Sequence, residues 1–557
     1  MMRWLALTGI VAAAVVAIML SERRKVDVAA DPAPLLYLIG DTEQELTRLP
    51  VRFTRMSDQA EIAIGDQLAS HYDSSWKDKK DEDRDVQAYV EQVGGRLASG
   101  AHRQLPYRFH YIPDQYSTNA FALPGGHVFI GKGLIALMDS EDELAAVLGH
   151  EIEHIEHYHC AERIQRQQAL RKVPFGELIA LPIEVFEAGY SKDQELEADR
   201  EGTRLAEQAG YSANGAIRMF ETFQRLYEEY HTRARTPQQE LSTVAQQTLE
   251  EYFRSHPLAS ERIAQIQTII ATEHWPTRAE RDLAVGYVFQ TDRAEAALQA
   301  GKFAIAAQMA TNSLKVRTAQ PRAMLVLAKA QFAQADFSAA AISFHRLLEL
   351  SGPQPEIANQ YAYALAAADP HRAASEFRQW MGSVAGNTNR FTVTLAGLEL
   401  LAGDPGPARI AAASAEQDPP LLGELGWWYY RAGDFGSAAD LITRAYQKRP
   451  GDTTTIVRLA WSQIELHRLA DALQTLEAVQ YELERVPAAQ GMARAVCKWQ
   501  ARQPDEALQD FERALSAGPE WQNPRWVTAL YSPLVVQSVQ EMRGEQERRR
   551  KLQASAR

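Results

Sequence analysis

A pair of histidines with a glutamate between them is the feature of this sequence best suited to chemistry. His150-Glu151-Ile152-Glu153-His154 follows the pattern H-E-x-x-H. Four residues are just over one helical turn, so both imidazoles project from one face of a helix towards a shared point. Neutral imidazole nitrogens suit Zn²⁺, and Glu151 is placed to accept the proton of an attacking water. The pattern predicts one zinc ion held by His150 and His154, with Glu151 as general base.

A catalytic zinc needs a third protein ligand, and an acidic segment downstream offers one. Ser191 begins what has the form of a capped helix, and Glu195, Glu197 and Asp199 follow it. On a helix Glu195 and Asp199 share a face, whereas Glu197 points away. Glu195 can therefore complete the ligand set, and Asp199 can orient a ligand histidine from behind. Taken alone, the cluster is also compatible with a solvated acidic helix that binds nothing.

The other histidines and the two cysteines follow no comparable pattern. His157 and His159 lie at spacings that spread them around the helix, so we interpret them as packing or surface polar residues. Cys160 and Cys497 are too few for a Cys-type zinc site or a disulfide scaffold, and Cys160 is interpreted as a small buried residue. Whether the two cysteines pair is left open.

Helices and a short hairpin are expected around the motif. Helical patterns cover residues 60–65 and 85–97, and the charged interval 74–85 between them is interpreted as a loop. Strands are predicted at 107–112, at 119–123 and, after a Pro-Gly-Gly turn, at 127–130. A long helix is predicted from Glu141 onward, and it would carry the histidine pair.

From about residue 285 the sequence becomes a series of alanine-rich helix pairs. A small residue recurs in the second helix of each pair at intervals of 34, 34, 34, 30, 34 and 35 residues, namely at Ala306, Ala340, Ala374, Ala408, Ala438, Ala472 and Ala507. This period is typical of the tetratricopeptide repeat, in which small residues stand where helices cross. We predict a C-terminal α-solenoid over 285–535 and a charged tail over 536–557.

Composition and the N-terminus limit the class of protein. The 557 residues suggest several domains, and 46% hydrophobic with 24% charged residues is globular. A formal charge of −13 argues against nucleic acid as a partner. Residues 1–30 contain the apolar run Trp4 to Leu20, flanked by Arg3 and Arg23. This run is interpreted as an uncleaved signal anchor, with a cleaved signal peptide as the alternative.

Four motifs occur in order and together resemble a known family. They are Asn119 to Gly126, His150 to His154, Ser191 to Asp199, and His256-Pro257 with Arg262. The chain resembles the integral or exported zinc endopeptidase family that contains HtpX and the CAAX-prenyl protease, over nearly all of its length after residue 35. The resemblance implies a mainly α fold with a small β-sheet, in which a gluzincin-type zinc metalloprotease domain (31–275) precedes the α-solenoid of tetratricopeptide repeats.

The resemblance also assigns roles to individual residues. It makes His150, His154 and Glu195 the ligands of one Zn²⁺ and Glu151 the general base. The edge strand that pairs with an extended substrate would comprise Asn119, Ala120, Phe121 and Ala122. His256 would stand near the metal, where it either stabilises the oxyanion together with Arg262 or caps the zinc in a latent state.

The function implied is that of an envelope quality-control protease. Such a protein would lie in the bacterial periplasm, tethered to the inner membrane through its N-terminal segment if that segment is uncleaved. It would cut unfolded or misassembled envelope proteins, and its repeats would recruit these substrates or an outer-membrane assembly machine. The alternative is a non-catalytic tetratricopeptide scaffold or chaperone with a silent protease domain, against which the complete set of site residues argues.

Overall fold

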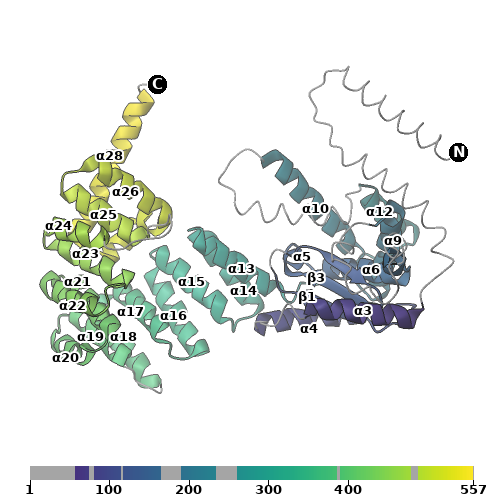
Figure 1. Cartoon of the computed structure of the whole chain (residues 1–557), viewed down its shortest axis with the longest axis horizontal. Coiled ribbons are helices and arrows are strands. Elements are labelled where there is room, and N and C mark those ends of the chain that lie inside the picture. Colours follow the sequence, from purple (N-terminus) through teal and green to yellow (C-terminus); the bar gives the residue numbers. More distant parts are fainter. Residues whose placement is uncertain are drawn as a thin grey trace. The chain divides into compact units, whose positions relative to one another are not determined.

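The computed structural model describes residues 57–73, 81–114, 117–164, 190–233, 260–384, 389–477 and 487–555. Contacts between residues divide the chain into two compact units, Met1–Leu283 and Ala284–Arg557, which we call the N-terminal unit and the repeat unit (Figure 1). Among the residues just given, no helix has both the length and the apolar character to cross a membrane. The predicted anchor or signal segment, residues 1–30, lies outside the described residues.

A three-stranded sheet forms part of the N-terminal unit. Its strands are β1 (Arg108–Ile112), β2 (Ala120–Leu123) and β3 (His127–Gly131), in the spatial order β1-β3-β2. The strand β2 pairs antiparallel with β3 through a turn in which Gly125 and Gly126 have positive φ, a conformation that side chains disfavour. The predicted hairpin is confirmed, and β1 adds to it in parallel. Consequently β2 stands at one edge of this sheet.

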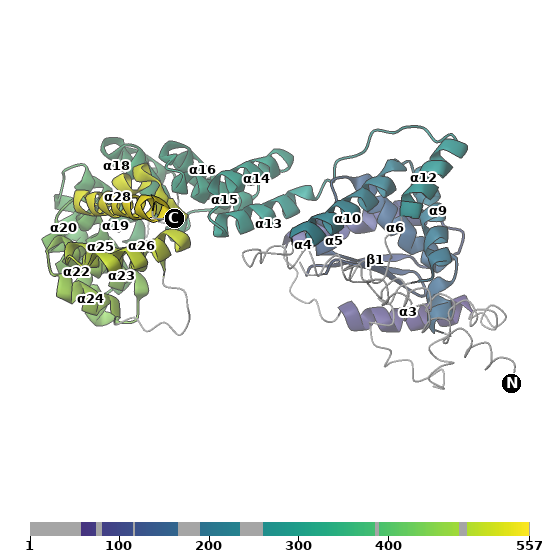
Figure 2. The same ribbon diagram turned by 90° about the horizontal axis from the view of Figure 1, so that it is seen from above.

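Helices lie on both sides of the sheet. The helix α3 (Asp58–Asp73) packs its Ile64 and Leu68 against Phe121, Leu123 and Phe129 of one sheet face. The helix α6 (Glu141–Glu156) contacts β2 and β3 from the other side (Figure 2). The remaining helices of this unit are α4 (Asp81–Ala98), α5 (Lys132–Ile135), α9 (Lys192–Gln208), α10 (Asn214–Arg233) and α12 (Ser260–Thr272).

Two of the helical predictions for this unit are confirmed and one loop boundary is wrong. The long helix from Glu141 is α6, and the helix predicted over 60–65 is part of α3. The interval 74–85 was predicted to be a loop, but α4 already begins at Asp81. Three acidic residues in the first turn of a helix are stabilised by its dipole, so the charge density there signalled a helix start.

The repeat unit is a succession of helix pairs (Figure 1). All seven recurring alanines are buried and each lies on the second helix of its pair, as predicted. The pairs are α13 (Gly286–Gln299) with α14 (Phe303–Val316), α15 (Pro321–Ala333) with α16 (Phe337–Ser351), α17 (Pro355–Ala368) with α18 (Pro370–Ser383), α19 (Asn389–Leu401) with α20 (Gly406–Ala415), α21 (Pro419–Arg431) with α22 (Phe435–Lys448), α23 (Thr453–Glu465) with α24 (Leu469–Glu477), and α25 (Ala488–Gln500) with α26 (Pro504–Ala517).

The chain continues past the repeats into three further elements: η2 (Pro519–Gln522), α27 (Pro524–Leu530) and α28 (Pro533–Ser555). Trp521 and Trp526 of these elements join the apolar core of the later repeats. Both cysteines are free and buried. The prediction of a mainly helical fold with a small sheet, followed by an array of helix pairs, is confirmed.

Candidate metal centre

Two helices supply the candidate ligands, and both begin at a capping box. The side chain of Ser140 accepts a hydrogen bond from the backbone of Glu143, whose carboxylate accepts one in return, so α6 begins at a fixed residue. Ser191 and Gln194 do the same for α9, as the sequence predicted for Ser191. Such reciprocal caps satisfy backbone donors that a helix start leaves open. The caps therefore set the register of every ligand that follows.

Glycines allow the two helices to approach closely. A Cβ atom placed on Gly149 of α6 would lie 2.7 Å from the backbone oxygen of Gly202, and one on Gly202 of α9 would lie 2.7 Å from the backbone nitrogen of His150. Neither glycine could therefore carry a side chain without a shift of backbone. The sequence did not predict the role of Gly202, because a single glycine within a helical pattern does not indicate which other helix packs against it.

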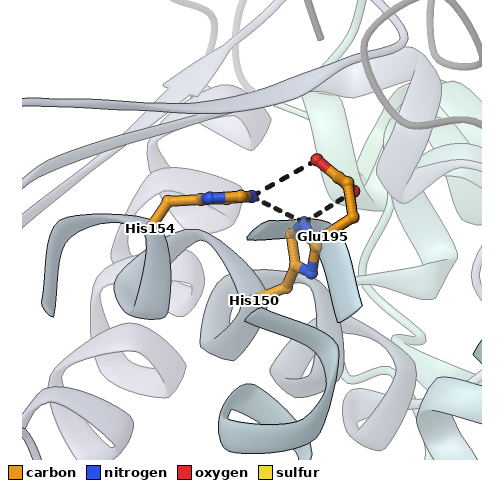
Figure 3. A group of neighbouring side chains, drawn as sticks. All are labelled: His150, His154 and Glu195. Carbon is orange, nitrogen blue, oxygen red and sulfur yellow. Dashed lines mark hydrogen bonds and ion pairs between the residues drawn. The ribbon is translucent and has the colours of Figure 1, made fainter. Parts of the chain in front are cut away.

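The close crossing brings three donor atoms together. The Nε2 atoms of His150 and His154 are 3.0 Å apart, and each lies 3.6 Å from a carboxylate oxygen of Glu195. Figure 3 shows the two imidazoles and the carboxylate converging, from one helix and its neighbour. All three residues are buried, with His154 fully excluded from solvent. In the described part of the chain, this is the one cluster of His, Cys, Asp and Glu with the geometry to hold a metal.

The spacing of these donors fits a tetrahedral zinc ion. With zinc–ligand bonds of roughly 2.0–2.1 Å, the edge of a tetrahedron is about 3.3 Å. The two imidazole nitrogens are 3.0 Å apart, and each lies 3.6 Å from a different oxygen of Glu195, Oε2 for His150 and Oε1 for His154, so these separations are close to that edge. Two imidazoles and one carboxylate also leave a fourth position for water, as in catalytic sites of this type. The residues present therefore fit a catalytic zinc.

A buried ion pair stands behind His150. Its Nδ1 donates to Asp199 at 2.9 Å, and Asp199 accepts in turn from the Nη2 of Arg262 at 2.6 Å. Burial alone would raise the pKa of Asp199, but the Arg262 guanidinium and the His150 hydrogen bond outweigh it and hold that pKa well below its usual range. Asp199 is thus a fixed anion that keeps the His150 lone pair on Nε2. Asp199 thus contacts His150, one of the two candidate ligand histidines.

Arg262 lies behind the ligands. Its guanidinium contacts Asp199 through Nε and Nη2, reaches Glu195 at 3.3 Å, and stacks on the ring of Phe220 at 4.4 Å. The side chain is buried, with 3% of its surface exposed. These contacts orient two carboxylates of the site, whereas the resemblance implied a role at the oxyanion. His256, with which Arg262 was expected to act, lies outside the described residues.

His154 has a different support. Its Nδ1 lies 2.9 Å from Nδ1 of His159, whose Nε2 lies 3.3 Å from Glu197, and its ring stacks on Tyr190 with centroids 3.8 Å apart. The pKa of Glu197 is lowered to about 2, chiefly by its hydrogen bond from His159. His159 is therefore buried, as a packing residue would be, but its contact with His154 was not predicted. A helical spacing rule could not place it, because α6 has ended and Tyr158 adopts a left-handed φ of 62°.

Glu151 faces a small cavity next to His150. The cavity measures about 20 Å³ and is also lined by Asp199, Phe220 and Arg262. A volume of this size holds about one water molecule. The candidate substrate strand contacts α6 through β2. Asn119 precedes β2, Ala120, Phe121 and Ala122 belong to it, and each of the four has at most 8% of its surface exposed. The edge position of β2 is as predicted.

Comparison with known proteins gives this geometry a context. Residues 82–270 match the model of peptidase family M48, and residues 429–496 match a tetratricopeptide repeat. The chain is 34% identical to the mitochondrial metalloendopeptidase OMA1 of Schizosaccharomyces pombe over 24% of this chain and 42% of that protein. It is 31% identical to the β-barrel assembly-enhancing protease of Yersinia pestis over 22% of this chain and 29% of that protein.

The protein of the same name from Escherichia coli K12 is 28% identical over 32% of this chain and 37% of its own length. The chain thus spans less than half the length of each of these three curated relatives. The candidate metal centre lies within residues 82–270, the part that matches the model of peptidase family M48.

Proposed function

Because the chain contains a peptidase family M48 domain and tetratricopeptide repeats, as its motifs predicted, we propose that it is a zinc-dependent endopeptidase. The observation that carries this proposal is the convergence of His150, His154 and Glu195 at tetrahedral spacing in a buried position. These three residues would hold one zinc ion. The proposal includes the predicted domains: a signal segment over 1–30, the protease domain over 31–275, the repeat array over 285–535 and a charged tail over 536–557.

The side chains around the site divide the work of peptide hydrolysis. When bound, the zinc ion acts as a Lewis acid on the peptide carbonyl and lowers the pKa of water. Glu151 takes a proton from the attacking water and later returns it to the leaving amine, as a general base and then acid. Asp199 and Arg262 hold His150 and Glu195 in place throughout. The edge of β2, from Asn119 to Ala122, would hydrogen-bond to an extended substrate.

The repeat unit and the relatives support a proposal for the cellular location and the substrates of the protein. Repeat arrays present extended surfaces that suit peptide segments or partner proteins. Two of the similar proteins are named for enhancing β-barrel assembly. We therefore propose that this chain is a bacterial envelope protease in the periplasm. Residues 1–30 would tether it to the inner membrane or would be cleaved off as a signal peptide. It would hydrolyse misfolded or misassembled envelope proteins that the repeats recruit, alone or together with an outer-membrane assembly machine.

The test uses the intact chain. Zinc per chain is measured together with hydrolysis of unfolded casein for the wild type, for Glu151→Gln and for Glu91→Gln as a matched control. Glu91 is an exposed glutamate of α4 that accepts a hydrogen bond from Gln87, so its amide variant changes one charge outside the residues of the candidate site. We expect one zinc per chain in all three proteins. Cleavage should fall by about 10²–10⁴-fold in Glu151→Gln alone, the usual share of a general base.

Two outcomes would contradict the proposal. A wild type that binds no zinc and cuts nothing would favour a tetratricopeptide scaffold with a silent protease domain. Undiminished cleavage by Glu151→Gln would remove the proposed base. A His256→Ala variant addresses the remaining alternative: higher activity would make His256 a cap on the zinc, and lower activity with zinc retained would make it a partner in catalysis.

A further inference from the structure

The two histidines of the candidate site are supported by different chemistry. His150 donates to a carboxylate, Asp199, which is itself locked by an arginine. His154 instead faces a third imidazole, His159, which has only 2% of its surface exposed. Beyond His159 stands Glu197, whose side chain is 37% exposed. The second support is thus a chain of two residues that runs from the buried ligand to the surface.

The proton positions along this chain follow from one requirement. A metal ligand must present a lone pair, so Nε2 of His154 carries no proton and its Nδ1 carries one. That Nδ1–H points at Nδ1 of His159, 2.9 Å away, which must therefore be an acceptor. The proton of the His159 ring then sits on Nε2, 3.3 Å from a carboxylate oxygen of Glu197. The reverse order would place a proton on Nε2 of His154 and block the metal.

The backbone after α6 is shaped so that His159 reaches back. The helix ends at Glu156, and Tyr158 takes a φ of 62°, a conformation uncommon for a residue with a side chain. Arg103 lies over the Tyr158 ring at 3.8 Å and donates to the carbonyl of Ile155 at 2.6 Å, which holds this reversal in place. Without the reversal, a residue five positions after His154 would lie on another face of the helix.

We propose that His159 is a positioning residue for the metal ligand His154, and that Glu197 fixes the proton of His159 so that His154 presents its lone pair to the metal. This inference rests on the zinc site proposed above. It assigns to His159 and Glu197, on one side of the site, the task that Asp199 performs on the other. Supports of this kind change metal affinity by about 10–100-fold when they are removed.

The experiment measures zinc affinity of the intact chain by competition with a chromophoric chelator. His159→Phe keeps a ring but removes both nitrogens, whereas His159→Asn keeps an oxygen near the position of Nδ1. We expect the zinc dissociation constant to rise about 10–100-fold in His159→Phe and much less in His159→Asn. The visible spectrum of the Co²⁺-substituted protein should change in His159→Phe and stay close to the wild type in His159→Asn.

Glu197→Ala and Glu197→Gln form a second pair at a half-exposed position. Ala removes the acceptor for His159, while Gln keeps an oxygen there, so zinc should bind more weakly to the Ala variant. His157→Ala is the matched control, because His157 contacts Glu153 and Glu197 and is itself partly exposed. It should bind zinc as the wild type does. Thermal unfolding of each zinc-free protein reports any loss of packing.

The outcomes separate this inference from the proposed function. A wild type without zinc affinity would overturn the metal site itself. A wild type that binds zinc, with His159→Phe equally tight or His159→Asn equally weakened, would overturn the role of His159 alone. If His159→Phe does not fold, the Glu197 pair decides: equal affinities of the Ala and Gln variants would overturn the proposal.

Discussion

Two helix crossings of this molecule show how the same packing device serves different ends. In the N-terminal unit, α6 and α9 cross at Gly149 and Gly202. In the repeat unit, α21 and α22 cross where Gly426 faces Ala438 and Ile442. Each crossing depends on residues without bulk at the point of approach. What surrounds the crossing differs.

Around the α21–α22 crossing the buried side chains are mostly apolar, with Leu422, Leu425 and Ile442 fully buried. Around the α6–α9 crossing the buried side chains include charged and titratable ones, and Glu151, Glu195 and Asp199 have at most 4% of their surface exposed. Burying apolar surface stabilises a fold, whereas burying charge costs free energy unless each charge is paired. The repeat crossing therefore supplies stability, and the α6–α9 crossing gives up stability to hold acidic groups and imidazoles where a metal needs them.

The largest expected effect comes from breaking the buried ion pair in each unit. Asp199→Asn removes the carboxylate closest to the buried Arg262 and leaves it only Glu195, 3.3 Å away, while Glu424→Gln removes the carboxylate that lies 2.7 Å from Arg458. Removing one partner of such a pair typically costs about 3–5 kcal/mol. We expect both variants to lower the free energy of unfolding of their own unit by this order, as measured by calorimetry.

Zinc affinity distinguishes the two variants. Asp199→Asn should also weaken zinc binding by about 10–100-fold, because His150 loses the carboxylate behind it. Glu424→Gln should leave zinc binding unchanged. Weaker zinc binding in Glu424→Gln would show that the buried charges of the repeat unit are coupled to the metal site, and the contrast drawn between the units would fail.

The sequence was sufficient wherever periodicity or a fixed spacing carried the information. The recurring alanines predicted each second helix of the array, because a crossing point that repeats about every 34 residues leaves a regular trace. The spacing of His150 and His154 predicted a shared point, since helical geometry alone brings them together. Neither inference required knowledge of a tertiary contact.

The sequence was insufficient where a side chain acts across elements or after a helix has ended. His159 was missed because its contact with His154 depends on the reversed backbone at Tyr158. Gly202 was missed because only the packed structure shows that it faces Gly149. The Arg262 contacts with Asp199 and Glu195 likewise arise between helices that are far apart in sequence. Such contacts leave no period to detect in a single chain.

Removal of zinc should lower the stability of the N-terminal unit only. A ligand that binds the folded state at 100 times its dissociation constant stabilises that state by about 2.7 kcal/mol. For a unit of this size, chelation should lower the midpoint of the N-terminal unit by roughly 5–10 °C. Seven of the ten tryptophans belong to the repeat unit, so their fluorescence reports its unfolding: Trp380, Trp427, Trp428, Trp461, Trp499, Trp521 and Trp526.

The fluorescence transition should therefore keep its midpoint when zinc is chelated. The calorimetric transition of the N-terminal unit should move to a lower temperature. Addition of zinc in excess of the chelator is the control, and it should restore the first trace. A fluorescence midpoint that falls together with the calorimetric one would mean that the two units unfold as one.

The smallest effect tests the crossings themselves. In Gly202→Ala the new Cβ would meet the backbone of His150 at 2.7 Å, whereas in Gly426→Ala it would meet the side chain of Ile442 at 2.5 Å. A side chain can rotate away and a helix backbone cannot, so the first substitution should cost more within the usual range of about 1–3 kcal/mol for overpacking. Gly95→Ala is the control, because nothing lies within 4 Å of the added atom. Denaturant unfolding gives the three free energies of unfolding.

Zinc titration of the same variants gives a second comparison. Only Gly202→Ala should weaken zinc binding, since it pushes α9 and its Glu195 away from the histidines of α6. Equal zinc affinity in Gly202→Ala and the wild type would mean that the close approach of the helices serves packing in both units alike.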